Sequence, residues 1–315
     1  MAKDAQYNQF RKEKSAALKP VRHFAEWLAL SALLGLAQAL SIPVNQRLGR
    51  WVGRVILKFA KKDLGVGLYQ LSFALPELDE AQRLALMAES AANVGQTLFE
   101  ALGLKNFAQD PQAWIELEGQ EVVEKLKAEG KGALMLFGHF GNWELIPLVY
   151  KMLDIHGVAP ESPIGEEKLD KMLIQNRTNS HFTVVPRGTA NSAKQMLSCL
   201  KGGGFYLMAI DQDLAKVQNL FVDFFGKKAA TSKGAANVAQ RFGVPVVSIF
   251  GNRLPNGRHK YRFELLSEPP YDQTEAEELA LTQRYTTAIE THIRANPGQW
   301  VWFHRRWKTR PEGEA

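Results

Sequence analysis

The sequence is poor in the residues on which several kinds of chemistry depend. Its 315 residues include one cysteine, Cys199, so no internal disulfide can form. Nothing around Cys199 indicates a reactive thiolate, and we expect a small buried hydrophobic residue there. The chain has no pair of Cys-x-x-Cys units and no His-Glu-x-x-His motif, which argues against a zinc site. Because it also lacks the P-loop and Rossmann glycine motifs, we expect neither a metal nor a cofactor.

Charge of one sign is in excess. Lysine and arginine number 39 against 33 acidic residues, and the net charge of +6 favours an anionic partner, either nucleic acid or a phospholipid surface. The length permits a large core without a second domain. We expect an N-terminal basic and membrane-anchoring segment over residues 1–62 and one α/β domain over residues 63–315.

The longest uncharged stretch lies near the N-terminus, from Trp27 to Gln46. Its length is about the minimum that spans a bilayer. Basic residues flank both ends, so the distribution of positive charge does not orient it. We expect residues 24–44 to form a hydrophobic membrane-associated helix, which either crosses the bilayer or lies within one leaflet. The segment from Trp51 to Phe59 then has the periodicity of an amphipathic helix.

Apolar segments alternate with helical patterns along the rest of the chain. Buried strands are predicted at 133–137, 184–186, 205–210 and 244–250, with a half-exposed strand at 261–266. Helices are predicted at 80–102, with Asp79 as N-cap, and at 166–177, 189–201 and 231–242, with Thr231 as N-cap. This alternation predicts an α/β fold with a mostly parallel, layered sheet flanked by helices.

A histidine directly follows the first of these strands. His139 is followed five positions later by Glu144. On a regular helix these side chains would point about 140° apart, so they can cooperate only if the backbone bends, which Gly141 and Asn142 allow. A histidine base oriented by a carboxylate is a compact way to activate a hydroxyl. We expect both to be catalytic, although a hydrogen-bonded structural histidine and a solvated glutamate would give the same spacing.

Other charged residues lie at strand ends. Asp211 and Asp213 follow the strand at 205–210, where they could orient a substrate, hold a cation, pair with arginine or cap a helix. Arg177 and Arg187 lie on either side of the strand at 184–186. Arginine is suited to bidentate contact with phosphate, although a solvated surface position is its usual one.

Two segments are dense in aromatic residues. Residues 220–226 contain three phenylalanines, which could belong to the core or to a loop that accepts an acyl chain. Residues 299–308 interleave tryptophan with basic residues, a pattern found both in nucleic-acid binding and at membrane interfaces. The uncharged N-terminal segment favours the membrane interpretation.

Together these motifs resemble the late acyltransferases of lipid A biosynthesis, a branch of the lysophospholipid acyltransferase superfamily. The resemblance covers nearly the whole chain and rests on His139 to Glu144, Asp211 to Asp213, residues 221–226, Thr231 and residues 302–312. It implies a glycerolipid acyltransferase-like fold in a Gram-negative enzyme at the cytoplasmic face of the inner membrane. The implied reaction moves a fatty acyl chain from an acyl carrier protein thioester to a hydroxyl of a Kdo-modified lipid A precursor.

The resemblance also implies roles for single residues. His139 would be the base and Glu144 its partner, Arg177 would match an arginine important for activity, and Asp211 or Asp213 a functional acid. The expected substrate-binding residues are Asn142, Arg177, Arg187, Asp211, Asp213 and Thr231. Because no serine or cysteine nucleophile is required, we expect direct transfer without a stable acyl-enzyme. Inner-membrane phospholipid is a further expected partner.

Other functions fit parts of the same sequence. The enzyme could acylate another glycolipid or a lysophospholipid, using acyl-CoA. A non-enzymatic, membrane-associated nucleic-acid-binding protein would account for the C-terminal segment alone, and a family member could bind lipid without activity. Since these last two leave the His139 and Glu144 arrangement without a purpose, we expect an enzyme and no nucleic-acid partner.

Overall fold

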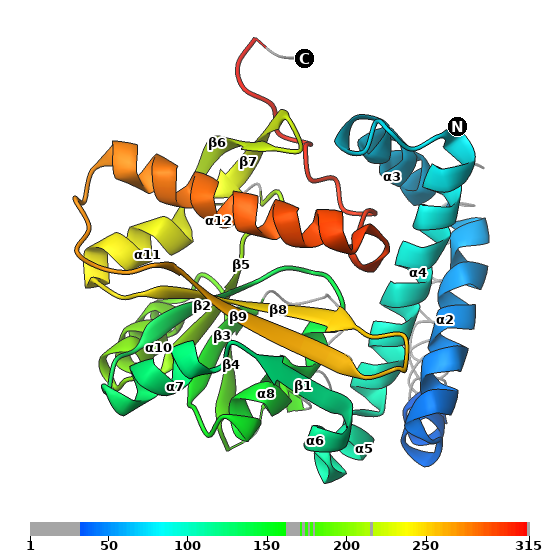
Figure 1. Cartoon of the computed structure of the whole chain (residues 1–315), viewed down its shortest axis with the longest axis horizontal. Helices are drawn as coiled ribbons and strands as arrows, with labels where there is room; N and C mark the ends of the chain where they lie inside the picture. The colour runs from blue at the N-terminus through cyan, green and yellow to red at the C-terminus, as the bar shows by residue number, and fades with distance from the viewer. Residues whose placement is uncertain are drawn as a thin grey trace, which may run out of the picture.

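A seven-stranded sheet in the order β1-β9-β8-β2-β5-β3-β4 forms the centre of the fold (Figure 1). The computed structural model describes residues 32–161, 171, 174–175, 177–178, 180–214 and 217–313. The strands are β1 (Ile115–Glu118), β2 (Ala133–Phe137), β3 (Gly157–Glu161), β4 (Phe182–Pro186), β5 (Phe205–Ala209), β8 (Val246–Arg253) and β9 (His259–Ser267). Only the pairing of β8 with β9 is antiparallel. The predicted α/β fold with a mostly parallel sheet is therefore confirmed.

Helices lie on both faces of this sheet, and the helices between residues 42 and 102 stand together beside one end of it (Figure 1). The helices are α2 (Ile42–Phe59), α3 (Lys61–Ala74), α4 (Glu80–Leu102), α5 (Leu104–Gln109), α6 (Pro111–Trp114), α7 (Glu121–Ala128), α8 (Ile146–Met152), α10 (Ala190–Lys201), α11 (Gly234–Phe242) and α12 (Glu275–Ala295), with short 3-10 helices η1 (Trp143–Leu145) and η2 (Pro297–Gln299). Two further strands, β6 (Asn219–Phe224) and β7 (Lys227–Ser232), form an antiparallel pair of their own.

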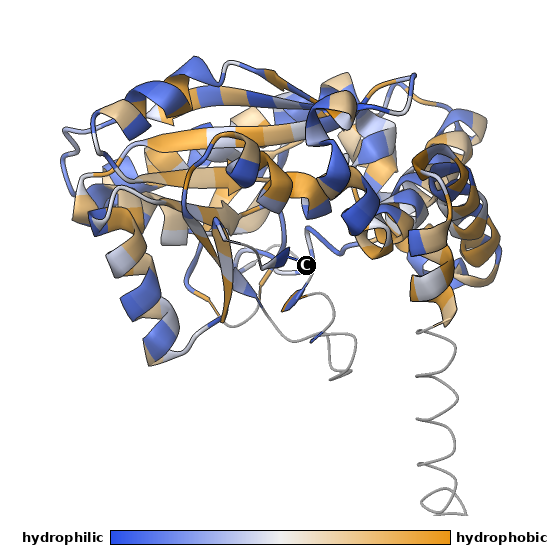
Figure 2. Cartoon of the chain, turned by 90° about the horizontal axis from the view of Figure 1, so that it is seen from below, coloured by the Kyte–Doolittle hydropathy of each residue, from blue (hydrophilic) through white to orange (hydrophobic). Residues whose placement is uncertain are grey.

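The central strand β2 shows why its sequence is a continuous apolar run. Leu134 and Leu136 belong to the core that α11 and α12 cover, whereas Ala133 and Met135 belong to the core against α7 and α8. A parallel strand buried on both faces has no solvent side on which a polar residue could alternate. The strands in the middle of the sheet are accordingly hydrophobic along most of their length (Figure 2). Burial of each large side chain contributes about 1.5–3 kcal/mol.

Most of the predicted strands and helices are present, but one predicted helix cap is wrong and one predicted helix falls largely outside the described residues. The helix from Glu80 begins with a capping box, in which the Asp79 carboxylate accepts from the backbone N–H of Gln82 and the Gln82 side chain accepts from that of Asp79. The prediction that Thr231 caps a helix is wrong, because Thr231 lies in β7 paired with Leu220 and α11 begins only after Lys233. The helix predicted at 166–177 falls largely outside the described residues.

The N-terminal hydrophobic segment is described only in part. Residues 24–31 of the predicted membrane helix lie outside the described residues, and residues 32–39 are helical. In the described part of the chain, no helix is long and apolar enough to cross a membrane. The membrane-associated helix therefore stays a prediction, as does the domain boundary at residue 62.

The aromatic and basic C-terminal segment is part of the core. Trp300, Trp302 and Trp307 are at most 8% exposed, and Arg306 is fully buried. The interpretation of this segment as a membrane-interface or nucleic-acid-binding surface is thus wrong, because its rings face inward. They pack against Phe224 and Phe225, which are buried as well, so the phenylalanine-rich segment also belongs to the core.

Glycine allows α2 and α4 to cross at very short range. A Cβ on Gly53 would overlap the carbonyl oxygen of Ala91, and one on Gly95 would overlap the backbone of Gly49. Apart from Ile42, the residues that α2 buries are small or polar, and the large side chains of Trp51, Ile56 and Phe59 are left on the outside. Backbone proximity, rather than side-chain volume, therefore fixes α2 on the fold.

We predict opposite effects for the same substitution at two helical glycines. Gly53→Ala should lower the free energy of unfolding by about 1–3 kcal/mol because the added methyl overpacks the crossing. Gly65→Ala, in α3, should raise it by about 0.5–1 kcal/mol, because that site is exposed with nothing within 4 Å. Urea unfolding of both variants tests this; equal shifts would contradict the close-crossing argument.

Candidate active site

The carboxyl ends of four neighbouring parallel strands converge on one region. His139 follows β2, Asp211 follows β5, Glu161 ends β3 and Arg187 follows β4. Open α/β sheets generally bind ligands at this edge, because the loops that leave the strands there can meet. The sheet thus brings together three residues that the sequence places after predicted strands, namely His139, Asp211 and Arg187.

His139 is hydrogen-bonded to Asp211. Its Nδ1 lies 2.8 Å from one carboxylate oxygen, and its backbone N–H donates to the other at 2.7 Å. Sheet register explains this contact: β2 and β5 pair in parallel with Phe137 opposite Ala209, so the residues two positions beyond each strand meet. The Asp211 side chain is 1% exposed, whereas that of His139 is 22% exposed.

The carboxylate of Asp211 is held in its ionised form. Burial alone would raise the pKa of Asp211, but the His139 imidazole and N–H, with the Trp300 indole N–H at 3.0 Å, lower it to about 2. An ionised carboxylate can only accept hydrogen bonds, so His139 Nδ1 must carry the proton. The other ring nitrogen, Nε2, is left for a substrate.

The C-terminal segment closes the site from the other side. Phe140 and Trp300 pair through an isolated antiparallel β-bridge, and the Val301 N–H donates to the His139 carbonyl at 3.2 Å. Asp213, which we had expected to bind substrate, instead accepts from the backbone N–H and hydroxyl of Thr309. Asp211 orients the imidazole, while Asp213 fastens the segment that carries Trp300.

Glu144 does not contact the imidazole in this structure. Its carboxylate accepts from Arg177 Nε at 2.7 Å and from a terminal guanidinium nitrogen at 2.6 Å, and Glu161 pairs with the same guanidinium. The expectation that Glu144 orients His139 is therefore corrected: among the described residues, Asp211 is the carboxylate in that position. Burial would lower the pKa of Arg177, but the two carboxylates outweigh it and raise the pKa.

The backbone bend predicted between His139 and Glu144 is real, but it separates the two side chains. Gly141 has φ +60°, in the left-handed region that favours glycine, and a Cβ there would overlap the carbonyl of Gly251. The Asn142 side chain then accepts from the Glu144 N–H at 2.8 Å and starts η1. This turn carries Glu144 towards Arg177 and away from Asp211.

A cavity of about 350 Å³ opens beside the imidazole. Its charged and polar lining includes His139, Glu161, Arg177 and Arg187. The apolar lining includes Phe137, Trp143, Pro147, Phe182, Val184 and Leu207. A mostly apolar cleft with a few convergent polar groups is typical of a small-molecule site. Its size and lining suit a flexible apolar chain whose reactive end lies near Nε2.

The remaining predicted substrate-binding residues fall into two groups. Arg187 is exposed at the cavity and has no carboxylate partner among the described residues. Asn142 and Thr231 are fully buried, so neither is placed to touch a substrate. The Thr231 hydroxyl contacts the buried Arg306. Cys199 is half-buried, and burial raises the pKa of its thiol to about 11, which disfavours the nucleophilic thiolate.

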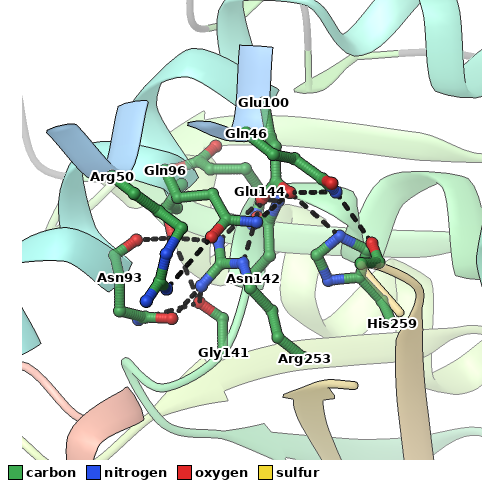
Figure 3. Close-up of polar contacts among 12 residues, drawn as sticks. Gln46, Arg50, Asn93, Gln96, Glu100, Gly141, Asn142, Glu144, Arg253 and His259 are labelled. Carbon is green, nitrogen blue, oxygen red and sulfur yellow. Dashed lines mark hydrogen bonds and ion pairs between the residues drawn. The ribbon is translucent and has the colours of Figure 1, made fainter. Parts of the chain in front are cut away.

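A buried polar network that the sequence did not predict lies behind residues 138–142, the loop between β2 and η1 that carries His139 (the His139 loop; Figure 3). Its centre is Glu100 of α4, which is fully buried and paired with Arg253 at 2.6 Å and His259 at 3.2 Å. The Asn142 amide donates to the same carboxylate at 2.7 Å. Burial would raise the pKa of Glu100, but Arg253 and His259 lower it well below its usual range. A signal was present: Asn93, Gln96, Thr97 and Glu100 form a polar stripe at helical spacing within an apolar stretch of α4.

Comparison with known proteins gives one consistent result. The profile of the family described as bacterial lipid A biosynthesis acyltransferase matches residues 11–309. A lipid A biosynthesis lauroyltransferase of Escherichia coli K12 is 29% identical over 303 residues, which is 95% of this chain and 96% of that protein. The palmitoleoyltransferase of the same strain is 24% identical over 93% of this chain and 94% of its own length. The myristoyltransferase is 24% identical over 98% and 94%.

We predict that Asp211 contributes to stability in a pH-dependent way. Its folded pKa is lowered, so its contribution is complete above the unfolded pKa and disappears as the pH falls towards about 2. A shift of this size corresponds to about 2–3 kcal/mol. Urea unfolding between pH 6 and pH 2.5 should therefore give a flatter stability profile for Asp211→Asn than for the unaltered chain; parallel profiles would contradict the prediction.

Proposed function

Because the chain belongs to the bacterial lipid A biosynthesis acyltransferases, an enzyme family of O-acyltransferases, we propose that it transfers a fatty acyl chain from a thioester to a hydroxyl of a lipid A precursor. The observation that carries the proposal is the position of His139. Its imidazole is oriented by a buried carboxylate and lines an apolar cavity at the carboxyl ends of four strands. This is the arrangement that a general base for a lipid alcohol needs.

The proton transfer follows from the hydrogen bond to Asp211. With the proton fixed on Nδ1, His139 Nε2 takes the hydroxyl proton of the acceptor as its oxygen attacks the thioester carbonyl carbon. Asp211 stabilises the imidazolium that forms, without accepting its proton. Collapse of the tetrahedral intermediate breaks the carbon–sulfur bond, and the imidazolium returns its proton to the departing sulfur. An ester and a thiol result, with no covalent acyl-enzyme.

Charged residues around the cavity have separate proposed roles. Glu144 and Glu161 hold the Arg177 guanidinium in the cavity wall, so Glu144 acts on the site through Arg177 and not through the His139 imidazole. Arg187, exposed and without a carboxylate partner among the described residues, is suited to a phosphate of the donor or acceptor. Acyl carrier protein is the proposed donor, because an acidic carrier complements a net charge of +6. Acyl-CoA is the alternative donor.

The outer face of α2 is suited to lying on the cytoplasmic surface of the inner membrane. Trp51, Ile56 and Phe59 are 57–82% exposed. Exposed basic residues flank them on the same helix, among them Arg54 and Lys58. Large aromatic side chains that enter the headgroup region beside cations that bind anionic lipid are typical of a helix that lies in the interface. This surface would bring the cavity to its lipid acceptor.

We predict that His139→Ala lowers the transfer rate by at least about 100-fold, because a positioned base contributes 10²–10⁴-fold. The assay offers acyl carrier protein and CoA thioesters of several chain lengths to lipid A precursor, lysophospholipid and other glycolipid acceptors, with products identified by mass spectrometry. Near-normal turnover in a folded variant would exclude His139 as the base. A preference for lysophospholipid, or for CoA donors, would replace the proposed substrates with the alternatives.

We also predict that Trp51→Ser combined with Phe59→Ser weakens binding to vesicles that contain anionic phospholipid by at least about tenfold, because two large apolar side chains no longer enter the interface. Leu279→Ser is the control, since Leu279 is 44% exposed on α12, away from α2 (Figure 1). Vesicle sedimentation measures the binding. Equal binding by the double variant and the control would contradict the proposed membrane surface.

A further inference from the structure

The carbonyl oxygen of Gly141, two residues after His139, is unusually crowded with hydrogen-bond donors. Asn93 Nδ2, Thr97 Oγ1 and a terminal nitrogen of Arg253 lie 3.2, 3.0 and 2.9 Å from it. A carbonyl oxygen has two lone pairs and is usually satisfied by one or two donors. The fold therefore concentrates three side chains, from α4 and β8, on one peptide group of the His139 loop; Figure 3 shows Asn93 and Arg253 beside Gly141.

Arg253, at the end of β8, holds the peptide units on both sides of Gly141. Its guanidinium contacts the Gly141 carbonyl directly, while its backbone N–H donates to the Gln299 side chain at 2.8 Å and its carbonyl accepts from the same side chain at 3.0 Å. The backbone carbonyl of Gln299 in turn accepts the Gly141 N–H at 3.1 Å. One arginine is thus connected to both polar groups of the residue that turns the chain after the base.

Glu100 fixes the guanidinium from the opposite side. Its carboxylate accepts from Arg253 Nε and from a terminal nitrogen, and also from the side-chain amide of Asn142 at 2.7 Å. The Arg253 side chain is 7% exposed and that of Glu100 is fully buried. A buried ion pair is a weak source of net stability, because desolvation offsets the attraction. A single fixed geometry is what such a network can provide.

We propose that Arg253 is a positioning residue for His139, acting through the Gly141 peptide. The inference rests on the proposed function of His139 as the base. The imidazole is held by Asp211 on one side of the loop, and the backbone of the same loop is held by Arg253 on the other. Release of the Gly141 carbonyl would let the loop shift, while the half of the cavity lining that comes from β3, β4 and β5 stays in place. Arg253 should therefore affect the rate of the chemical step more than donor binding.

Arg253→Lys tests the proposal, because lysine keeps the charge opposite Glu100 but cannot reproduce the guanidinium contacts. A misplacement of about 1 Å can cost about 100-fold in rate, and we expect kcat to fall by about 10–100-fold with the donor KM within about threefold. Hydrogen exchange should become faster in peptides that cover residues 138–145 and stay unchanged in those from α12. The matched control is Arg258→Lys on the same β8–β9 hairpin, whose arginine pairs with Glu116 and should leave all three quantities unchanged.

Thr97→Val provides a second variant if Arg253→Lys does not fold. It removes the hydroxyl that donates to the Gly141 carbonyl and accepts from the Arg253 guanidinium at 2.7 Å, without changing charge or shape; we expect kcat to fall by about 2–10-fold. Wild-type kcat in both variants, or faster exchange throughout the molecule with kcat lost in the same proportion, would overturn the proposal. His139→Ala distinguishes failure of the positioning role of Arg253 from failure of the proposed function. If it is inactive while the Arg253 and Thr97 variants are fully active, the positioning role alone fails; if it is active, the proposed function fails.

Discussion

The hydrogen bond between Asp211 and the His139 imidazole is the interaction on which the rest of the site depends. It exists because β2 and β5 are adjacent, parallel and paired so that Phe137 lies opposite Ala209. Extension of that register by two residues places a carboxylate opposite a histidine. The apolar residues that build the two strands therefore also set the geometry of the proposed base, and a shift in register would separate the pair.

The C-terminal segment acts as a second support for the same pair. The Trp300 indole donates to Asp211, and the backbone of Val301 donates to the His139 carbonyl. Arg306 is fully buried and contacts the carbonyl of Ala230 and the hydroxyl of Thr231, and burial lowers its pKa to about 10. Burial of a guanidinium among neutral partners costs free energy. The segment is also held by the Asp213 carboxylate, which accepts from the backbone N–H of Thr309. The density of tryptophan and arginine thus reflects internal packing and not an outer surface.

The two faces of the His139 loop explain how a candidate active site with a partly exposed imidazole can be rigid. On one side lies the mostly apolar cavity, which admits the acyl chain in the proposed reaction. On the other side, Glu100 and Arg253 satisfy the polar groups of Gly141 and Asn142 inside the protein. The same carboxylate accepts from Gln46 of α2, so the helix with the exposed aromatic face is joined to the loop through a single buried residue.

The sequence by itself determined the elements and the position of the proposed base. Continuous apolar runs predict strands buried on both faces, Asp79 as N-cap predicts the start of α4, and a histidine after the central strand predicts where the proposed chemistry lies. These signals are local, so spacing alone carries them. Only the tertiary structure decided the partners: Asp211 in place of Glu144 beside His139, Arg177 beside Glu144, and Glu100 with Arg253 behind the loop. Residues far apart in the chain make these contacts, and strand register and the turn at Gly141 select Asp211 although the sequence spacing favoured Glu144.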